Sequence, residues 1–347
     1  MKLGAIPENP LDLAALATGL APTPLLDTIV ALLLARSVMV GVRLGVFEAL
    51  ADGPYTAAEV ADRCGTHPQA TDRLLSALAG AGYLRRVKYG FGLAPVARRW
   101  LLKGSAHSLY DAILLQFVDA RLIEQTERFV RTGEAAHLHE ALGADEWDVY
   151  QRGMRSGANI AAAELARRLP VPPGARDLLD IGGSHGQYSV ALCRRHPDLR
   201  AVVLDLPQAV AAAAPILARE GMGDRVTHWA ADAREADLGE CSYDVILIFN
   251  LIHHFDAAAN RDLFVRCARA LRPGGMLAVG DMIRPDGPGA SGQLDALVDL
   301  YFAVTSAAGS YTYGEVSGWQ AQAGLRPRKP MRLLAGPGAG VQIAIKP

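Results

Sequence analysis

The chain has 347 residues, a formal net charge of −1, 50% hydrophobic residues and 20% charged residues. This is the composition of an ordinary globular protein with room for two or three domains. The near-zero net charge gives no electrostatic case for nucleic-acid binding. No unbroken apolar run reaches the roughly eighteen residues that predict a membrane span. We therefore expect neither a nucleic-acid partner nor a membrane partner.

The cysteines and the N-terminus indicate a cytoplasmic protein. The four cysteines lie far apart and form no Cys-x-x-Cys pair, so they predict buried thiols in a reducing compartment rather than disulfides or metal ligands; they are Cys64, Cys193, Cys241 and Cys267. The N-terminus carries Glu8 and Asp12 and lacks the basic-then-apolar pattern of a signal peptide. We expect a cytoplasmic location and no metal site.

Residues 10–50 are helical in pattern and strongly apolar. Apolar residues recur there at mixed spacings of three and four, which predicts helices that are apolar on more than one side. Such a surface has to be covered, and near one end of the chain a second subunit is the expected cover. The sequence therefore predicts a homodimer held by the apolar surface between residues 21 and 50.

The next segment predicts a winged helix. A capping box at Thr56 and Glu59 begins one helix, a second helix covers residues 69–78, and residues 83–93 alternate like a hairpin. The second helix offers Arg73 offset by Asp72, which is a poor surface for reading bases. We therefore expect residues 1–105 to form a mostly helical winged-helix dimerisation domain rather than a DNA-binding one.

The remaining chain divides at a rigid breaker, Pro-Val-Pro-Pro-Gly, at residues 170–174. Residues 106–170 predict a helical connector that contributes to a substrate pocket. Residues 171–347 alternate strands and helices, which predicts an α/β, doubly wound, Rossmann-like sheet of seven strands. The expected strands are residues 177–181, 199–205, 225–230, 243–249, 276–281, 325–334 and 341–345. Ligands bind such a sheet at the carboxyl ends of its strands.

Two strand ends carry the chemistry of a nucleoside site. After the first strand, Asp180, Gly182 and Gly186 are spaced Asp-x-Gly-x-x-x-Gly, whereas a dinucleotide fingerprint would need glycines in place of Ser184 and Gln187. The second strand ends in Asp205, which either caps the following helix or accepts the ribose hydroxyls of an adenosine. The two features together favour the ribose contact.

These motifs resemble one family. Leu-Asp-Ile-Gly-Gly (179–183), Leu-Asp-Leu-Pro (204–207), Asn-Leu-Ile-His-His-Phe-Asp (250–256) and Leu-Arg-Pro-Gly-Gly (271–275) are similar to the motifs of class I S-adenosylmethionine-dependent small-molecule O-methyltransferases that carry an N-terminal winged-helix dimerisation domain. The resemblance covers residues 20–347. It departs at Ser184, where the family usually has glycine, and at Ala231, where the family has glycine before the aspartate.

The resemblance implies S-adenosyl-L-methionine as cofactor and a set of residues around it. The glycines would lie under its methionine part, Asp205 would hold the ribose and Asp232 would lie beside the adenine. The implied cofactor-binding residues are Asp180, Gly182, Gly183, Gly186, Asp205, Leu206, Asp232, Ala233 and Asn250. An aromatic or polyketide-like small molecule is the implied substrate, and the expected wall residues are Phe117, Trp147, Met154, His254 and Phe302.

The resemblance also implies a general base. His253 stands where the family's histidine removes a phenol proton, and Asp281 stands where a family glutamate orients that histidine. A phenol with a pKa of about 10 needs such a base at neutral pH. A second family glutamate is matched by Ser310, which weakens the case for a phenol-specific base.

Several alternatives therefore stay open. His254 rather than His253 could be the base, or the histidine pair could only shape the loop. The reaction could be C-methylation, or the chain could be a non-methylating relative that keeps the cofactor. A winged-helix regulator that senses a small ligand is the alternative from another class, but it predicts a basic recognition helix that the sequence lacks.

Overall fold

The computed structural model describes residues 2–287, 292–306, 308–336 and 338–347. The described chain forms two compact units, Lys2–Phe117 and Val118–Pro347. The boundary between them falls inside helix α8 (Tyr110–Ile123), within the connector expected from the sequence.

The N-terminal unit follows the predicted order of helix, turn, helix and hairpin. The capping box is confirmed, because Thr56 Oγ accepts from the Glu59 N–H and Glu59 Oε2 accepts from the Thr56 N–H at 2.7 Å. The hairpin pairs antiparallel strands β1 and β2. The elements of this unit are α1 (Pro10–Ala17), α2 (Thr23–Leu25), η1 (Leu26–Val30), α3 (Ala31–Arg43), α4 (Val46–Ala49), α5 (Ala57–Cys64), α6 (Pro68–Gly80), β1 (Leu84–Val87), β2 (Gly90–Leu93) and α7 (Pro95–Trp100), followed by most of α8.

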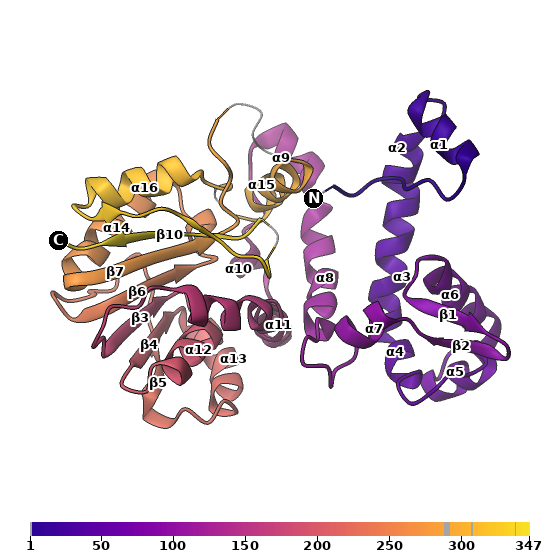
Figure 1. Cartoon of the computed structure of the whole chain (residues 1–347), viewed down its shortest axis with the longest axis horizontal. Helices are drawn as coiled ribbons and strands as arrows, with labels where there is room; N and C mark the ends of the chain where they lie inside the picture. The colour runs from indigo at the N-terminus through magenta and orange to yellow at the C-terminus, as the bar shows by residue number, and fades with distance from the viewer. Residues whose placement is uncertain (1, 288–291, 307, 337) are drawn as a thin grey trace. The chain divides into compact units, whose positions relative to one another are not determined.

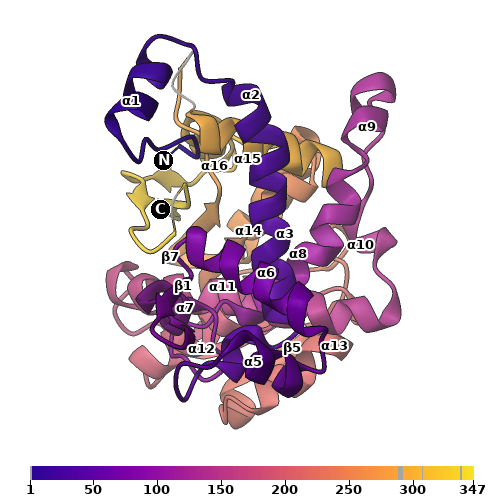
Figure 2. The same ribbon diagram turned by 90° about the vertical axis from the view of Figure 1, so that its right-hand side faces the viewer.

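Elements α2, η1 and α3 follow one another as one continuous helix (Figure 2), and many of its apolar side chains are exposed. Leu25, Ile29, Leu32 and Leu33 are each exposed by 58–61%. By length and composition Thr23–Arg43 could cross a membrane, although only 22% of its most apolar stretch is buried. A core helix of a soluble protein, or a signal sequence, can have the same length and apolar composition. The sequence prediction, which considered only unbroken apolar runs, did not identify this helix as long and apolar enough to span a membrane.

The C-terminal unit begins with helices and continues as a mixed sheet (Figure 1). Its strands run in the order β5-β4-β3-β6-β7-β10-β8, with β9 also paired to β10. All neighbours from β5 to β7 are parallel, and β10 is antiparallel to β7. The elements are α9 (Thr126–Thr132), α10 (Leu138–Ala141), α11 (Ala144–Arg168), β3 (Asp177–Ile181), α12 (Gln187–Arg195), β4 (Arg200–Asp205), α13 (Pro207–Ala218), η2 (Gly223–Arg225), β5 (Val226–Ala230), β6 (Tyr243–Phe249), η3 (Ile252–His254), α14 (Ala257–Ala270), β7 (Leu271–Asp281), α15 (Gln293–Thr305), α16 (Tyr313–Gln322), β8 (Arg326–Pro327), β9 (Met331–Arg332) and β10 (Gly340–Ile345).

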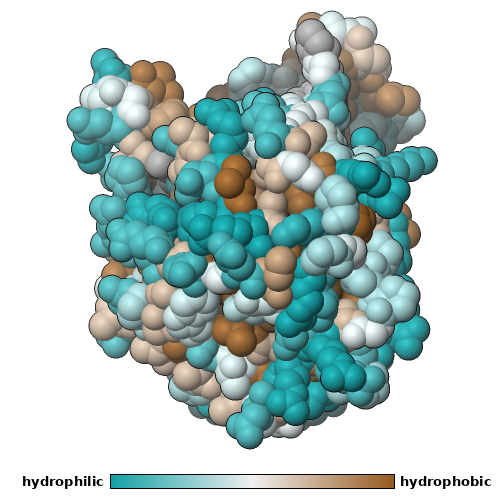
Figure 3. All heavy atoms as spheres, turned by 90° about the vertical axis from the view of Figure 1, so that its left-hand side faces the viewer, coloured by the Kyte–Doolittle hydropathy of each residue, from teal (hydrophilic) through white to brown (hydrophobic). Residues whose placement is uncertain are grey.

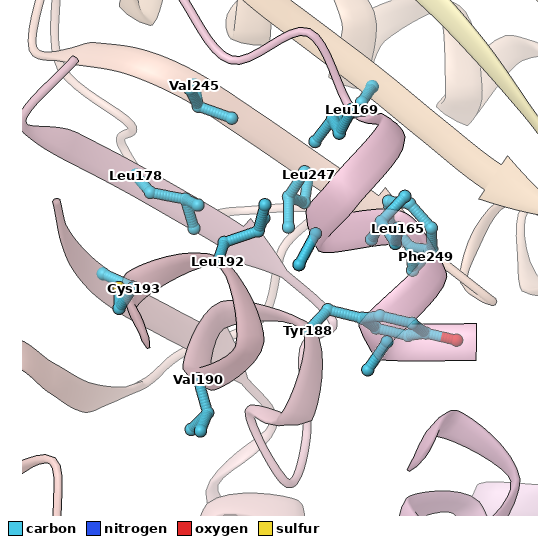
Figure 4. Packing of buried hydrophobic residues seen from close by; sticks show 14 of the residues in the cluster. Leu165, Leu169, Leu178, Tyr188, Val190, Leu192, Cys193, Val245, Leu247 and Phe249 are labelled. Atoms are coloured by element: carbon cyan, nitrogen blue, oxygen red, sulfur yellow. The ribbon is translucent and has the colours of Figure 1, made fainter. Parts of the chain in front are cut away.

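Helices cover both faces of this sheet. Helices α11, α12 and α13 bury one face, and Figure 4 shows Tyr188 of α12 beside Phe249 of β6, with ring centroids 4.7 Å apart. Helices α14 and α16 bury the other face. Because both faces are covered, the central strands are apolar throughout, as expected of a parallel sheet. The surface drawn in Figure 3 is mainly hydrophilic, with scattered apolar side chains.

The α/β fold is confirmed, and two strands differ from their expected bounds. The single strand expected at 325–334 is two short pieces, β8 and β9, because Pro330 offers no N–H to a ladder and interrupts the pairing. Strand β7 begins at Leu271 rather than at Met276, with a register shift opposite Tyr243 and Val245. The predicted Arg-Pro-Gly-Gly turn lies within that irregular start. The sheet therefore has eight strands instead of seven.

Candidate functional site

The loop between β3 and α12 brings backbone close to any ligand at the sheet's edge. Gly182 and Gly186 have φ of +69° and +73°, a region that disfavours side chains. A Cβ on Gly183 would lie 2.4 Å from the Asp180 carboxyl carbon. The loop thus needs glycine at these positions for its own packing. Beyond it, α12 begins at Gln187, whose N–H donates to His185 Nδ1 at 3.1 Å.

Asp180 is buried beneath this loop. Its Oδ2 accepts a hydrogen bond from Ser189 Oγ at 2.7 Å, and Oδ1 has no partner within the described residues. Burial raises the pKa of Asp180 to about 7, against the lowering effect of the Ser189 hydroxyl. An acceptor without a donor is therefore held at the base of the loop.

Asp205 ends β4 beside the same loop. Its Oδ1 accepts from the Leu206 N–H at 2.7 Å, but the N-cap of α13 is Leu206 and no side chain caps that helix, so the alternative that Asp205 caps it is wrong. Burial raises the pKa of Asp205 to about 6, while the Leu206 and Ser184 N–H groups lower it. The carboxylate is ionised at neutral pH and retains lone pairs for further donors.

Two adjoining cavities lie at the carboxyl ends of β3, β4, β5 and β6. The larger has a volume of about 630 Å³, and the predicted residues that line it are Trp147, Gly182, Asp205, Leu206, Asp232, Ala233 and His254. The smaller is about 50 Å³, and the predicted residues that line it are Trp147, Met154, Gly182, Gly183, Asp205, Leu206, Asn250 and His254. Asp232, at the far end of the larger cavity, is paired with Arg234 at 2.6 Å.

A nucleoside cofactor with an amino-acid tail fits this arrangement. The larger cavity offers Asp205 to ribose hydroxyls, and the smaller continues along the glycine loop, where it is lined by Gln151. Gln151 Nε2, and Asp180 Oδ1 buried beneath the loop, are polar atoms that lack partners in the described structure. Buried polar atoms of this kind usually have a partner, so they favour a polar ligand here.

His253 and Asp281 form the predicted pair. His253 Nδ1 lies 2.9 Å from each oxygen of the Asp281 carboxylate, and the two side chains are 7% and 3% exposed. The ring of Phe302, on α15, stacks on the His253 ring with centroids 3.7 Å apart and planes 4° apart. The Phe302 ring therefore covers one face of the imidazole.

His254 faces the cavities and belongs to a second histidine group. Its Nδ1 lies 2.7 Å from Ser306 Oγ, and its ring centroid is 4.6 Å from that of His139. His139 Nε2 lies 3.2 Å from the hydroxyl of Tyr150. Burial, and then the neighbouring His253, lower the pKa of His139 to about 4. The same causes, burial first, lower the pKa of His254 well below its usual value. Both rings are neutral at physiological pH.

Six predicted site residues do not line either cavity: Phe117, Asp180, Gly186, His253, Asp281 and Phe302. Phe117 belongs to the N-terminal unit, where the Arg43 guanidinium lies 3.1 Å from its ring centroid, so its place in the substrate wall stays a prediction. Gly186 is the N-cap of α12 and packs toward Leu217. Ser310, which replaces the family's second glutamate, is buried, and in the described chain its hydroxyl has no partner.

The sequence interpretation missed His139, Gln151 and Ser306. Gln151 had a usable signal, because Trp147, Gln151 and Met154 are spaced four and three apart, which places them on one face of α11. His139 and Ser306 gave no such signal, since they come from the short α10 and from the residue after α15. Only the folded chain brings them to His254.

Comparisons with known proteins agree with this site. The family model described as the O-methyltransferase domain matches residues 122–325, and the O-methyltransferase dimerisation domain matches residues 26–103. The 3-hydroxy-5-methyl-1-naphthoate 3-O-methyltransferase of Streptomyces sahachiroi is 29% identical over 337 residues, covering 94% of this chain and 95% of the relative. The mitomycin biosynthesis 6-O-methyltransferase of Streptomyces lavendulae is 29% identical over 362 residues and covers 99% of both chains.

Solved structures share the fold over the whole length. Mitomycin 7-O-methyltransferase MmcR has a TM-score of 0.79 at 27% identity, covering 96% of this chain and 99% of its own. Human N-acetylserotonin methyltransferase in complex with S-adenosylmethionine has a TM-score of 0.80 at 18% identity, with 99% of both chains covered. With the family models and the cavity beside the glycine loop, these findings make the chain a member of the O-methyltransferase family, an S-adenosylmethionine-dependent enzyme that carries the family's dimerisation domain.

Proposed function

We propose that the enzyme methylates a hydroxyl of an aromatic or polyketide-like small molecule, with His253 as the general base. The observation that carries the proposal is the contact of His253 Nδ1 with both Asp281 oxygens at 2.9 Å. A carboxylate accepts hydrogen bonds only, so Nδ1 carries the proton and Nε2 keeps its lone pair. That nitrogen is the one a substrate hydroxyl would meet.

Bound S-adenosylmethionine supplies a methyl group on an electrophilic sulfonium. The protein's part is to orient the acceptor and remove its proton as the oxygen attacks. The Nε2 lone pair of His253 lies in the plane of the imidazole ring, so the Phe302 ring stacked on one face leaves the lone pair free. Asp281 also stabilises the imidazolium that forms when the proton is transferred.

The lining of the cavities supports a flat aromatic acceptor. Trp147 lies nearly parallel to His139, at 16°, with ring centroids 5.6 Å apart. Tyr150 lies edge-on to both rings. Aromatic walls of this kind bind ring systems by stacking, while the neutral His139 and His254 offer polar contacts. The names of two relatives, a naphthoate and a mitomycin methyltransferase, agree with such an acceptor.

A non-methylating reaction is the second candidate. It is favoured by Ser310, where the resemblance expects a second glutamate, and by the 29% identity over 287 residues to aclacinomycin 10-hydroxylase RdmB of Streptomyces purpurascens. A C-methylated product is the third possibility. Product mass after incubation with isotopically labelled cofactor and a panel of phenols separates these reactions.

The base role is tested with His253→Ala against His254→Ala. We expect His253→Ala to lower kcat by about 10²–10⁴, the usual contribution of a positioned base, while the cofactor Kd stays nearly unchanged. His254→Ala should have a smaller effect, because that ring contacts Ser306 and shapes the cavity. Near-normal kcat in folded, cofactor-binding His253→Ala would rule out the base role.

We also infer that the exposed apolar surface of α2, η1 and α3 forms the homodimer contact. This helix lies largely within the matched dimerisation domain, and its leucines are too exposed for a surface in water. Light scattering should give about twice the monomer mass. Leu32→Glu with Leu33→Glu should shift the mass toward the monomer, and an unshifted mass would place the contact elsewhere.

A further inference from the structure

Gln151 is the polar side chain near the cofactor loop that neither the motifs nor the base mechanism uses. It lies on α11 and is fully buried. Its Oε1 accepts a hydrogen bond from Ser184 Oγ. Its Nε2 has no partner in the part of the chain that the structure describes. A buried amide with an unpaired donor is destabilising unless a ligand supplies an acceptor.

Ser184 is the residue that holds Gln151 in this orientation. It stands at the middle position of the glycine loop and has φ of +53°, in the left-handed region. Its carbonyl oxygen lies 2.8 Å from His228 Nε2, and its hydroxyl donates to Gln151. The serine is thus held on both sides, and its bond to Gln151 Oε1 leaves the amide NH₂ as the free end.

That free end borders the place where the tail of the cofactor would lie. Gln151 and Ser184 line the smaller cavity together with Gly182, Gly183 and Asp205. The cavity continues from the nucleoside side, marked by Asp205, along the glycine loop. S-adenosylmethionine has a carboxylate and an ammonium group at this end of the molecule.

We infer that Gln151 Nε2 binds the carboxylate of the cofactor's amino-acid end. An N–H donor suits a carboxylate and not an ammonium group, and a hydrogen bond to a charged acceptor is about twice as strong as a neutral one. His185, which also lines this cavity, accepts from the Gln187 N–H at Nδ1, and burial lowers its pKa to about 3, so it brings no positive charge for a carboxylate. Gln151 therefore places a buried N–H donor without a partner in the described chain beside the loop.

The first test of the inference compares the binding of three ligands to the wild-type protein. S-adenosylhomocysteine has the whole tail, decarboxylated S-adenosylhomocysteine lacks only the carboxylate, and 5′-methylthioadenosine lacks both charged groups. Calorimetry should show wild-type binding the complete ligand at least about tenfold more tightly than the decarboxylated one. Equal affinities would overturn the inference without any variant.

Gln151→Met keeps the length of the side chain and removes the donor. We expect it to weaken S-adenosylhomocysteine binding by about 10–100-fold and to change binding of the other two ligands less than twofold. Gln320→Met is the matched control, because Gln320 is also fully buried in this unit but its amide donates to the Gln342 carbonyl, outside both cavities. It should change none of the three affinities.

Two results with the variant would contradict the inference. An equal loss for all three ligands would mean that Gln151 only supports the loop through Ser184. A loss shared by the complete and the decarboxylated ligand, but absent for 5′-methylthioadenosine, would mean that the amide is reversed and that Oε1 binds the ammonium group.

Discussion

The cofactor side and the acceptor side of the site are built differently. The cofactor side consists of strand ends and a glycine loop, where Asp205 lines the cavities and Asp180 is buried beneath the loop. The acceptor side consists of rings from separate elements, His139 from α10, Trp147 from α11 and His254 from η3. The first is fixed by the sheet, which is buried on both faces. The second depends on how helices pack over it.

This difference predicts separate consequences for binding and for turnover. Changes at the strand ends should alter cofactor affinity, because they affect groups that contact the cofactor before any acceptor is bound. Changes among the rings should alter turnover and leave cofactor affinity nearly intact. A variant that changes cofactor affinity and turnover together would contradict this difference between the two sides.

The largest effect on the cofactor side should come from Asp205→Ala. Losing an ionised acceptor of the ribose hydroxyls should weaken binding of S-adenosylhomocysteine by about 1.5–3 kcal/mol, which is roughly 10–150-fold in Kd. Calorimetric titration measures the change. Asp232→Ala is the comparison on the adenine side, where Arg234 already occupies the carboxylate, so its loss should be smaller. Unchanged affinity in Asp205→Ala would mean that Asp205 does not hold the ribose.

Asp281→Asn should be the next largest effect and should fall on turnover. Asparagine keeps the shape but can present its NH₂ to His253 Nδ1, which disfavours the tautomer with a free Nε2. We expect kcat to fall by about 10–100-fold, on the scale of a lost hydrogen bond to a charged group. The cofactor Kd should stay within twofold. A change in Kd equal to the change in kcat would indicate a general structural defect instead.

The same division explains what the sequence could predict. Asp180, Gly182 and Asp205 lie beside strand ends, so the alternation of strands and helices was enough to bring them together. His253 and Asp281 follow β6 and end β7, which are neighbours in the sheet, and their contact was predictable for the same reason.

Contacts that depend on helix packing were not predictable. His139 reaches His254 only because α10 and the chain after α15 lie over the sheet's edge, and neither has a hydrophobic period that fixes its placement. Phe302 was predicted as a wall residue, and its stacking on His253 follows from the placement of α15. The strand expected at 325–334 was wrong in extent because the apolar pattern there outweighed Pro330 in the interpretation.

A pH series sharpens the comparison on the cofactor side. The raised pKa of Asp205, about 6, means that the carboxyl takes up a proton as the pH falls below that value. A protonated acid accepts the ribose hydroxyls poorly, so S-adenosylhomocysteine affinity should fall by about tenfold between pH 7 and pH 5. Asp205→Asn should bind more weakly at pH 7 and lack this pH dependence. An identical pH profile in the variant would assign the titration to another group.

The same protonation has the opposite sign for folding. Because the pKa of folded Asp205 lies above its usual value of 3.8, burial of the charge is destabilising at neutral pH. The penalty is relieved as the pH falls through about 6, so this residue's contribution to the free energy of unfolding of the ligand-free protein should rise between pH 7 and pH 4. The difference in unfolding free energy between wild type and Asp205→Asn isolates it.

The smallest effect expected is that of Phe302→Leu, and it distinguishes two roles for this ring. If Phe302 fixes the plane of His253, its loss removes a stacking contribution of about 0.5–1.5 kcal/mol and lowers kcat by about 2–10-fold, with little change in acceptor KM. If Phe302 is instead a wall of the acceptor pocket, KM should rise while kcat stays near normal. The parallel stack at 3.7 Å favours the first role. Phe302→Tyr keeps the ring and should retain most of the activity under either role. If only KM rises in Phe302→Leu, Phe302 is a wall of the acceptor pocket rather than a support for the base. Asp281 would then be the residue that orients His253.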